Sequence, residues 1–217
     1  MAKIAIMPTR PRAAPPEGER VYLRPPRKSD AAAFLAAAAA SRQLHGRWVS
    51  APQTAAAFEA YRARFGGRGA QRAQAGFIAL RRDDQSLVGV FNFSEIVRGA
   101  FQSAYLGYYG FRGNVGRGLM HEGLALALDA AFGALALHRV EANIQPGNER
   151  SVALVTALGF TEEGFSRRYL CIAGRWRDHV RFAMLAEDWR RLRRSHPPAA
   201  GERGTARSTT PSARTIR

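Results

Sequence analysis

The sequence GFRGNVGRGLM, residues 110–120, decides the fold, because it joins two segments with different hydrophobic periods. Before it, residues 103–109 (SAYLGYY) have the composition of a β-strand. After it, residues 119–135 repeat apolar side chains at helical spacing. The stretch is therefore a glycine-rich turn that leads from a strand into a helix.

Glycines and a helix start make this turn suitable for an anion. Gly113, Gly116 and Gly118 let the backbone approach a ligand and expose successive amide N–H groups. The helix that begins near Leu119 adds the positive end of its dipole, and Arg117 adds charge. The turn predicts a phosphate or diphosphate site.

The elements on either side of the turn give the fold class. Their order is one strand, two helices, three antiparallel strands, a helix, a strand, a helix and a closing hairpin. This order predicts an α/β (α+β) domain with a mixed central sheet and helices on both faces. The predicted strands are 21–24, 77–80, 87–93, 103–109, 138–144, 166–172 and 176–185; the predicted helices are 31–40, 53–65, 119–135 and 149–158.

Three classes of phosphate loop compete for the turn. A Walker loop needs GxxxxGK followed by Ser or Thr, which this chain lacks. A dinucleotide-binding loop follows the first strand of a parallel unit, whereas this one follows three antiparallel strands. The remaining class is a loop that binds the diphosphate of coenzyme A.

Several segments between residues 21 and 189 resemble the GNAT superfamily of N-acetyltransferases, in particular its RimJ/RimL branch. They are VYLRPPRKSD, GVFNFSEIVRGAF, YLGYYGFRGNVGRGLMHEGLALAL, HRVEANIQPGNERS and ALGFTEEGFSRRYLCIAGRWRDHV. The closing GRWRDH is the segment most similar to the RimJ group of ribosomal-protein alanine acetyltransferases. The resemblance implies the GNAT acyl-CoA N-acyltransferase fold, with acetyl-CoA as co-substrate and no metal.

The resemblance also implies where acetyl-CoA binds. The family's diphosphate pattern falls on Val115, Gly118 and Met120, and two of these three depart from it. The backbone of Gly116, Arg117, Gly118 and Leu119 is then expected to do the binding. The backbone of Tyr108, Tyr109 and Gly110 is expected to hold the pantetheine arm, and so is the side chain of Asn148.

The resemblance implies one catalytic residue, and the place of a second residue in the predicted hairpin suggests another. RimL-like relatives use a serine as the acid that protonates the departing thiolate, and Ser151 is the match here. Val155 stands where other relatives have a tyrosine acid, and Asn143 stands where some have a glutamate base. Glu95 is the candidate general base, acting on the acceptor through water.

An enzyme with a weak general base is better suited to an α-amine as acceptor than to a lysine side chain. The reference pKa of an α-amine is about 7.7–8.0 and that of lysine about 10.4, so far more of the α-amine is neutral at pH 7. The expected acceptor is the N-terminal alanine of a ribosomal protein. Two alternatives remain open: a small-molecule amine as acceptor, and a non-catalytic GNAT protein that binds ribosomes or RNA.

Composition and charge complete the predictions. The net charge is +16, and 31 of the 33 basic residues are Arg. Residues 1–19 read as a disordered basic arm, 20–192 as the GNAT domain and 193–217 as a disordered Arg-rich tail, a possible contact for ribosome or RNA. One cysteine, no apolar run of about 20 residues and no secretory leader predict a cytoplasmic protein with no membrane contact.

Overall fold

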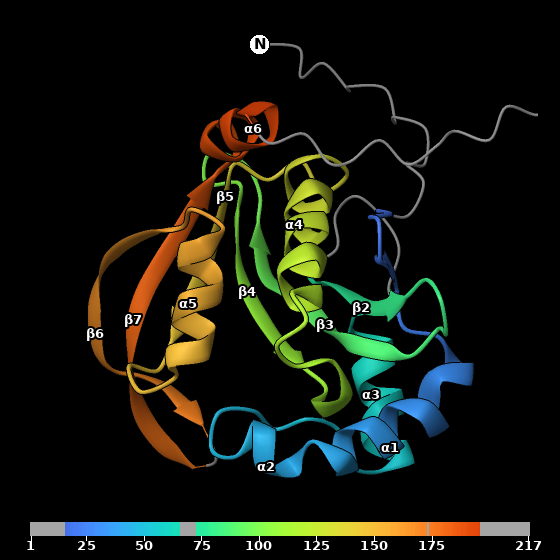
Figure 1. Cartoon of the computed structure of the whole chain (residues 1–217). Helices are drawn as coiled ribbons and strands as arrows, with labels where there is room; N and C mark the ends of the chain where they lie inside the picture. Colours follow the sequence, from blue (N-terminus) through green and yellow to red (C-terminus); the bar gives the residue numbers. More distant parts are fainter. Residues whose placement is uncertain (1–15, 66–72, 173, 196–217) are drawn as a thin grey trace, which may run out of the picture.

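The computed structural model describes residues 16–65, 73–172 and 174–195. Within them, seven strands form one sheet and six helices pack around it (Figure 1). The strands are β1 (Val21–Arg24), β2 (Ala75–Arg81), β3 (Leu87–Val97), β4 (Ser103–Gly110), β5 (Arg139–Ile144), β6 (Thr161–Ile172) and β7 (Arg175–Leu185). The helices are α1 (Ala31–Ala40), α2 (Arg42–His45), α3 (Ala55–Phe65), α4 (Leu119–Phe132), α5 (Glu149–Ala157) and α6 (Ala186–Ser195).

The sheet is mixed, with strand order β1-β2-β3-β4-β5-β7-β6. β4 and β5 form its single parallel pair, and the other neighbours are antiparallel. Helix α4 connects the two parallel strands, as such a crossover requires. The predicted fold class is therefore confirmed.

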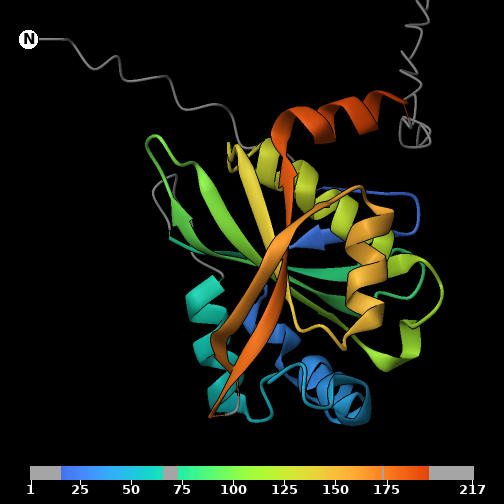
Figure 2. The same ribbon diagram turned by 90° about the vertical axis from the view of Figure 1, so that its left-hand side faces the viewer.

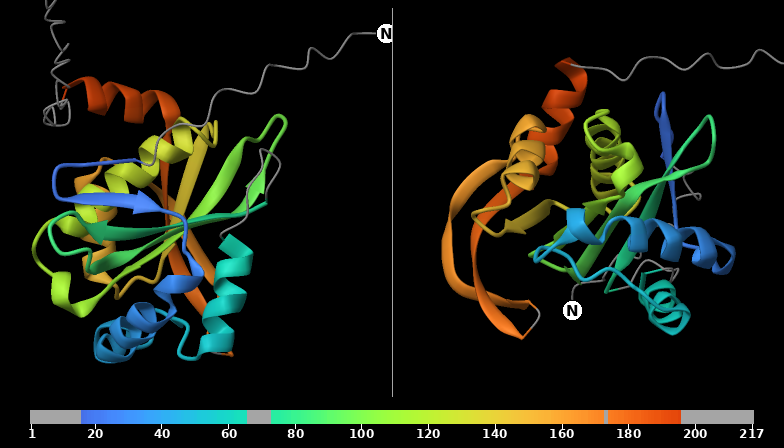
Figure 3. Two further views of the ribbon diagram at one scale, coloured as in Figure 1. Left: turned by 90° about the vertical axis from the view of Figure 1, so that its right-hand side faces the viewer. Right: turned by 60° about the horizontal axis from the view of Figure 1, so that its bottom comes forward.

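Helices cover both faces of the sheet (Figures 2 and 3). On one face, α4 and α5 pack on a large apolar core that includes Phe91, Leu124 and Val140. On the other face, α1 and α3 build a smaller core with Phe34, Phe58 and other aromatic side chains against β2 and β3. The site lies where these two layers meet the middle of the sheet.

Most predicted elements are found within a few residues of their expected bounds. Helices α2 and α6 were missed, and β6 starts at Thr161 rather than at residue 166. Asp30 is the N-cap residue of α1 but makes no capping bond. Its carboxylate is instead held by Arg24 at 2.7 and 2.8 Å and by the Arg27 N–H at 2.6 Å. Gly66 and Gly67, a glycine pair that predicts the end of the helix now seen as α3, lie outside the described residues.

Regular structure extends beyond both expected domain boundaries. Glu17 forms a β-bridge with Tyr22, inside what was predicted to be a disordered arm. At the other end, α6 continues to Ser195, three residues past the predicted boundary. Asp129 of α4 holds this helix, because it accepts hydrogen bonds from Trp189 Nε1 at 2.9 Å and from Arg193 Nε at 3.1 Å.

The hairpin of β6 and β7 is long and curves away from the rest of the sheet (Figure 3). Near its end, Cys171 is paired with Trp176, and both side chains are exposed. No helix among the described residues is long and apolar enough to cross a membrane.

Candidate functional site

The central parallel strands separate along most of their length. β4 and β5 are paired only from Ser103 to Tyr105 on β4 and from Arg139 to Glu141 on β5. Beyond Tyr105, β4 stays paired with β3 as far as Gly110, while β5 stays paired with β7. The two strands therefore form a splay that opens toward the glycine turn. We call the turn, residues 110–118, the glycine loop.

The glycine loop depends on backbone conformations that favour glycine. Gly116 and Gly118 have φ of 75° and 73°, and Gly118 is the N-cap residue of α4. Leu119 is buried and Met120 packs on Gly89 and Gly110, where an added Cβ would meet the Met120 side chain at 2.5 Å and 3.1 Å respectively. Leu119 can therefore contribute to a ligand through its backbone only, whereas Met120 is half-buried.

Four side chains hold the glycine loop in place, three from other parts of the chain and one, Asn114, from the loop itself, and sequence reasoning missed all of them. At its entry, His45 Nε2 bonds the Gly110 carbonyl at 2.9 Å, and Ser41 Oγ accepts the Arg112 N–H at 3.0 Å. In the middle, Asn114 Nδ2 donates to the Leu87 carbonyl at 2.8 Å. At the exit, Arg20 Nη1 donates to the Arg117 carbonyl at 3.0 Å.

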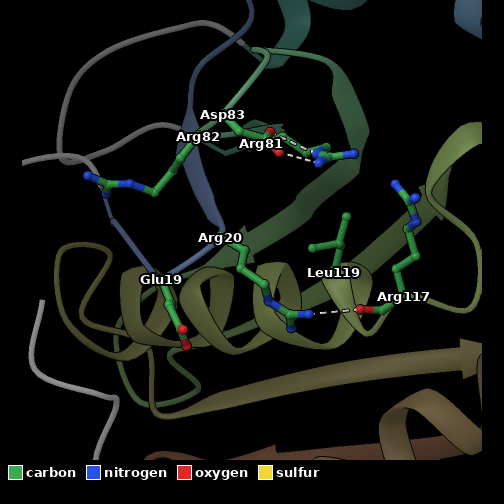
Figure 4. Close-up of a pocket in the computed structure, with 7 residues that line it drawn as sticks. All are labelled: Glu19, Arg20, Arg81, Arg82, Asp83, Arg117 and Leu119. Atoms are coloured by element: carbon green, nitrogen blue, oxygen red, sulfur yellow. Dashed lines mark hydrogen bonds and ion pairs between the residues drawn. The ribbon is translucent and has the colours of Figure 1, made fainter.

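A hollow of about 530 Å³ borders the exit of the loop and is lined mainly by arginine (Figure 4). Arg20 is bound to Glu122, Arg81 to Asp83 and Arg82 to Glu17. The Arg117 guanidinium has no partner among the described residues and is free to meet an anion. Because the other arginines are neutralised, we do not place the reaction here. Val115, at the tip of the loop, is 45% exposed.

Tyr108 and Ser151 lie together across the splay. Ser151 Oγ donates to the Tyr108 hydroxyl at 2.8 Å, and that hydroxyl donates to the Ser151 carbonyl at 3.0 Å. Burial raises the pKa of Tyr108 to about 12, although the bond with Ser151 opposes the rise. Tyr108 thus stays a phenol at neutral pH. The sequence placed Tyr108 in the site through its backbone and did not anticipate this hydroxyl pair.

Tyr109 points to the opposite face from Tyr108, as alternation along a strand requires. It packs in the smaller core, with its ring 5.0 Å from that of His45 and 5.8 Å from that of Phe111. Its hydroxyl is buried and has no hydrogen-bond partner. The side chain is thus part of the packing, and the expected role of the Tyr109 backbone stays a prediction.

Asn148 is the N-cap residue of α5, but its side chain makes no capping hydrogen bond. Helix capping by the side chain, the usual reason for an asparagine at this position, therefore does not apply here. Its carbonyl accepts the Ser151 N–H at 3.0 Å, which fixes the first turn of α5. The Asn148 amide is left available beside Ser151.

The structure does not bring Glu95 to the splay. Glu95 is exposed in a bulge of β3, with φ of 48°, between the residues paired with Tyr105 and Ser103. The glycine loop begins at Gly110, which pairs with Gly89, and Gly89 lies six residues or roughly 20 Å from Glu95 along β3. Its expected role as base stays a prediction that this placement does not support.

The chain is similar in sequence to a known family and to proteins of named activity. Residues 20–161 match the family model described as the acetyltransferase (GNAT) domain. The [ribosomal protein uS5]-alanine N-acetyltransferase of Escherichia coli (strain K12) is 44% identical over 107 residues, which span 49% of this chain and 55% of that protein. The chain thus matches little more than half the length of that relative.

Two solved structures are similar over most of the chain. The ribosomal-protein-S5-alanine acetyltransferase from Vibrio fischeri has a TM-score of 0.72 at 25% identity and covers 82% of this chain and 99% of its own. Mycobacterium smegmatis RimJ, in complex with CoA-disulfide, has a TM-score of 0.71 at 30% identity, covering 81% and 88%.

Nothing among the described residues resembles a metal site, since no three His, Cys, Asp or Glu side chains group there.

The splay, the glycine loop and the family model agree on one assignment. The chain belongs to the GNAT acetyltransferase domain family.

Proposed function

We propose that this protein is an acetyl-CoA-dependent N-acetyltransferase that modifies the N-terminal α-amine of a protein. The expected acceptor is the N-terminal alanine of a ribosomal protein. Support for the reaction comes from the family, and support for the acceptor comes from the named activity of the Escherichia coli relative. The observation that carries the proposal is the splay of β4 and β5, with the Tyr108–Ser151 pair at its side.

The residues of the splay fit coenzyme A. Open space lies beside Gly113 and Gly116, so a diphosphate could approach the backbone amides of the loop and the free Arg117 guanidinium. The unpaired length of β4 from Tyr108 to Gly110 and the Asn148 amide would hold the pantetheine arm. When bound, acetyl-CoA supplies a thioester carbonyl for an amine to attack.

Tyr108 and Ser151 are the proposed source of the proton that the departing thiolate needs. Ser151 Oγ carries a proton toward Tyr108, whose own proton points at the Ser151 carbonyl. A proton lost from either hydroxyl can be replaced through the other, because the oxygens are 2.8 Å apart. Val155, where a tyrosine acid would otherwise stand, is fully buried in the core.

Incubation with acetyl-CoA and short peptides tests the proposal. We expect thiol release with peptides that begin with Ala, Ser or Thr, and little with Nα-blocked lysine peptides at pH 7. Mass spectrometry would locate the acetyl group on the α-amine. No transfer to any α-amine, with coenzyme A still bound, would refute the proposed acceptor class.

A further inference from the structure

The side of β5 and β7 that faces away from α4 and α5 is polar. Along β5, Val140, Ala142 and Ile144 are buried in the large core, so Glu141 and Asn143 must point to the other side. On β7, Arg181 is the cross-strand neighbour of Asn143. We call Tyr105, Glu141, Asn143, His179 and Arg181 the polar face.

Asn143 occupies a special position on this face. The last β5 residue paired with β4 is Glu141, so Asn143 stands where the splay has opened. Its Oδ1 is buried and has no hydrogen-bond partner, and the same holds for Nε of Arg181 beside it. A buried polar atom without a partner costs about 1–3 kcal/mol, so such atoms are rare in native proteins. Two on neighbouring residues leave hydrogen-bonding capacity for a polar ligand at this place.

The carboxylates nearby are already bound. Arg139 Nε donates to Glu141 at 2.8 Å, and Arg139 Nη1 donates to Glu163 at 3.0 Å. The charge of both acids is therefore already shared with Arg139. The unpartnered acceptor at the splay is an uncharged amide oxygen.

The remaining titratable groups of the face are Tyr105, His179 and Arg181, and Tyr169 of β6 lies against them. The hydroxyl of Tyr169 on β6 lies 3.3 Å from that of Tyr105 on β4. This hydrogen bond and, to a smaller extent, burial raise the pKa of Tyr105 to about 12. His179 is buried against the Tyr169 ring, and burial lowers its pKa. At neutral pH, Tyr105 and His179 are therefore uncharged.

From these placements we propose that Asn143 is the residue that selects α-amines, by accepting an N–H of the acceptor through Oδ1. An amide oxygen orients a neutral amine, whereas a carboxylate would stabilise the ammonium form and raise the pKa of the amine. α-Amines are neutral more often than lysine side chains at pH 7, so a site of this kind favours them. This inference rests on the proposed function and assigns acceptor choice to one residue.

Two substitutions of Asn143 test the role. Asn143→Leu keeps the shape and removes the acceptor, and Asn143→Asp keeps an oxygen in place. For an Ala-starting peptide, we expect Asn143→Leu to lower kcat/KM about tenfold through KM, the loss of roughly one hydrogen bond. Asn143→Asp should restore KM and move the rise of rate with pH to higher pH.

Affinity for coenzyme A, measured by calorimetry, should be the same in all three proteins, which separates acceptor recognition from general damage to the fold. If both variants keep the wild-type KM and pH profile while the wild type acetylates α-amines, the role of Asn143 is wrong and the proposed function stands. If the wild type acetylates no α-amine, both are wrong.

Discussion

The glycine loop and the polar face border the same splay, yet they are built in opposite ways. In the loop, His45, Ser41 and Arg20 bond the backbone at its entry and exit, and the loop's own Asn114 bonds the Leu87 carbonyl from its middle. On the polar face, Asn143 Oδ1 and Arg181 Nε are buried without partners. The loop therefore has its shape before any ligand arrives, whereas the polar face keeps hydrogen-bonding capacity for one. Preorganisation suits the co-substrate that does not vary, and unused capacity suits the acceptor.

The largest expected effect comes from the hydroxyl pair between these two regions. Tyr108→Phe combined with Ser151→Ala removes both candidate proton donors, and we expect kcat to fall about 100-fold, at the low end for general acid catalysis. Steady-state kinetics with an Ala-starting peptide would measure it. Each single variant should lose less, because the other hydroxyl remains. A double variant as active as the wild type would place the acid elsewhere.

The shape of the loop can be broken at one glycine. Gly116 has φ of 75°, so Gly116→Val introduces strain of about 1–3 kcal/mol without a clash. We expect the dissociation constant for coenzyme A to rise about tenfold or more. Gly113→Val is the control, because Gly113 lacks a positive φ and its added side chain also meets open space. Equal losses in both variants would show that bulk, rather than conformation, matters.

A smaller effect is expected at the entry of the loop. His45→Phe removes the hydrogen bond to the Gly110 carbonyl, and a loss of about 1 kcal/mol would weaken coenzyme A binding about fivefold. His45→Gln, which keeps an N–H donor, should recover part of it. Calorimetry with coenzyme A separates this from a simple loss of stability. A lower melting temperature with unchanged affinity would contradict a role in shaping the loop.

The polar face should make stability depend on pH. Burial lowers the pKa of His179 below its ordinary 6.5, although its hydrogen bond with the Arg177 carbonyl opposes the shift. The unfolded chain then takes up a proton more readily than the folded one, so stability falls as pH drops below about 6.5. We expect the drop in Tm on acidification to be smaller in His179→Gln than in the wild type, by on the order of 2 °C. Parallel Tm–pH curves for the two proteins would contradict this.

The smallest effect concerns the end of the chain. A protein that ends at Ser195 keeps the ion pair of Arg193 with Asp129, and one that ends at Leu192 loses it. This pair is partly exposed, so the difference in unfolding free energy should be at most about 1 kcal/mol. Both proteins should retain wild-type transfer kinetics. Loss of activity in the longer of the two would assign a function to residues 196–217.

Sequence predicted the features that local pattern encodes. The glycine loop, the order of strands and the first turn of α5 each appear as short stretches with a definite period or composition. The contacts that hold the loop do not, because Arg20 and Arg117 are 97 residues apart and Ser41 and Arg112 are 71 apart. No spacing rule connects such pairs.

The two catalytic candidates show the same division. Ser151 was found by its place in a motif, but its contact with Tyr108 joins residues 43 positions apart. Glu95 was chosen by its place after a predicted strand, although β3 continues to Val97 and pairs in a register that carries Glu95 away from the loop. Register and bulges depend on the neighbouring strand, so one strand's sequence could not reveal them.

The exposed Cys171 also has a chemical consequence. It is the single cysteine of the chain, so each molecule presents one reactive sulfur to disulfide and maleimide reagents. Reagents that detect the thiol of released coenzyme A will therefore also record one equivalent from the protein itself. The same property allows one fluorophore to be attached to Cys171 on β6, beside Trp176 at the outer end of the hairpin. The other strand of this hairpin, β7, carries Arg181 and His179.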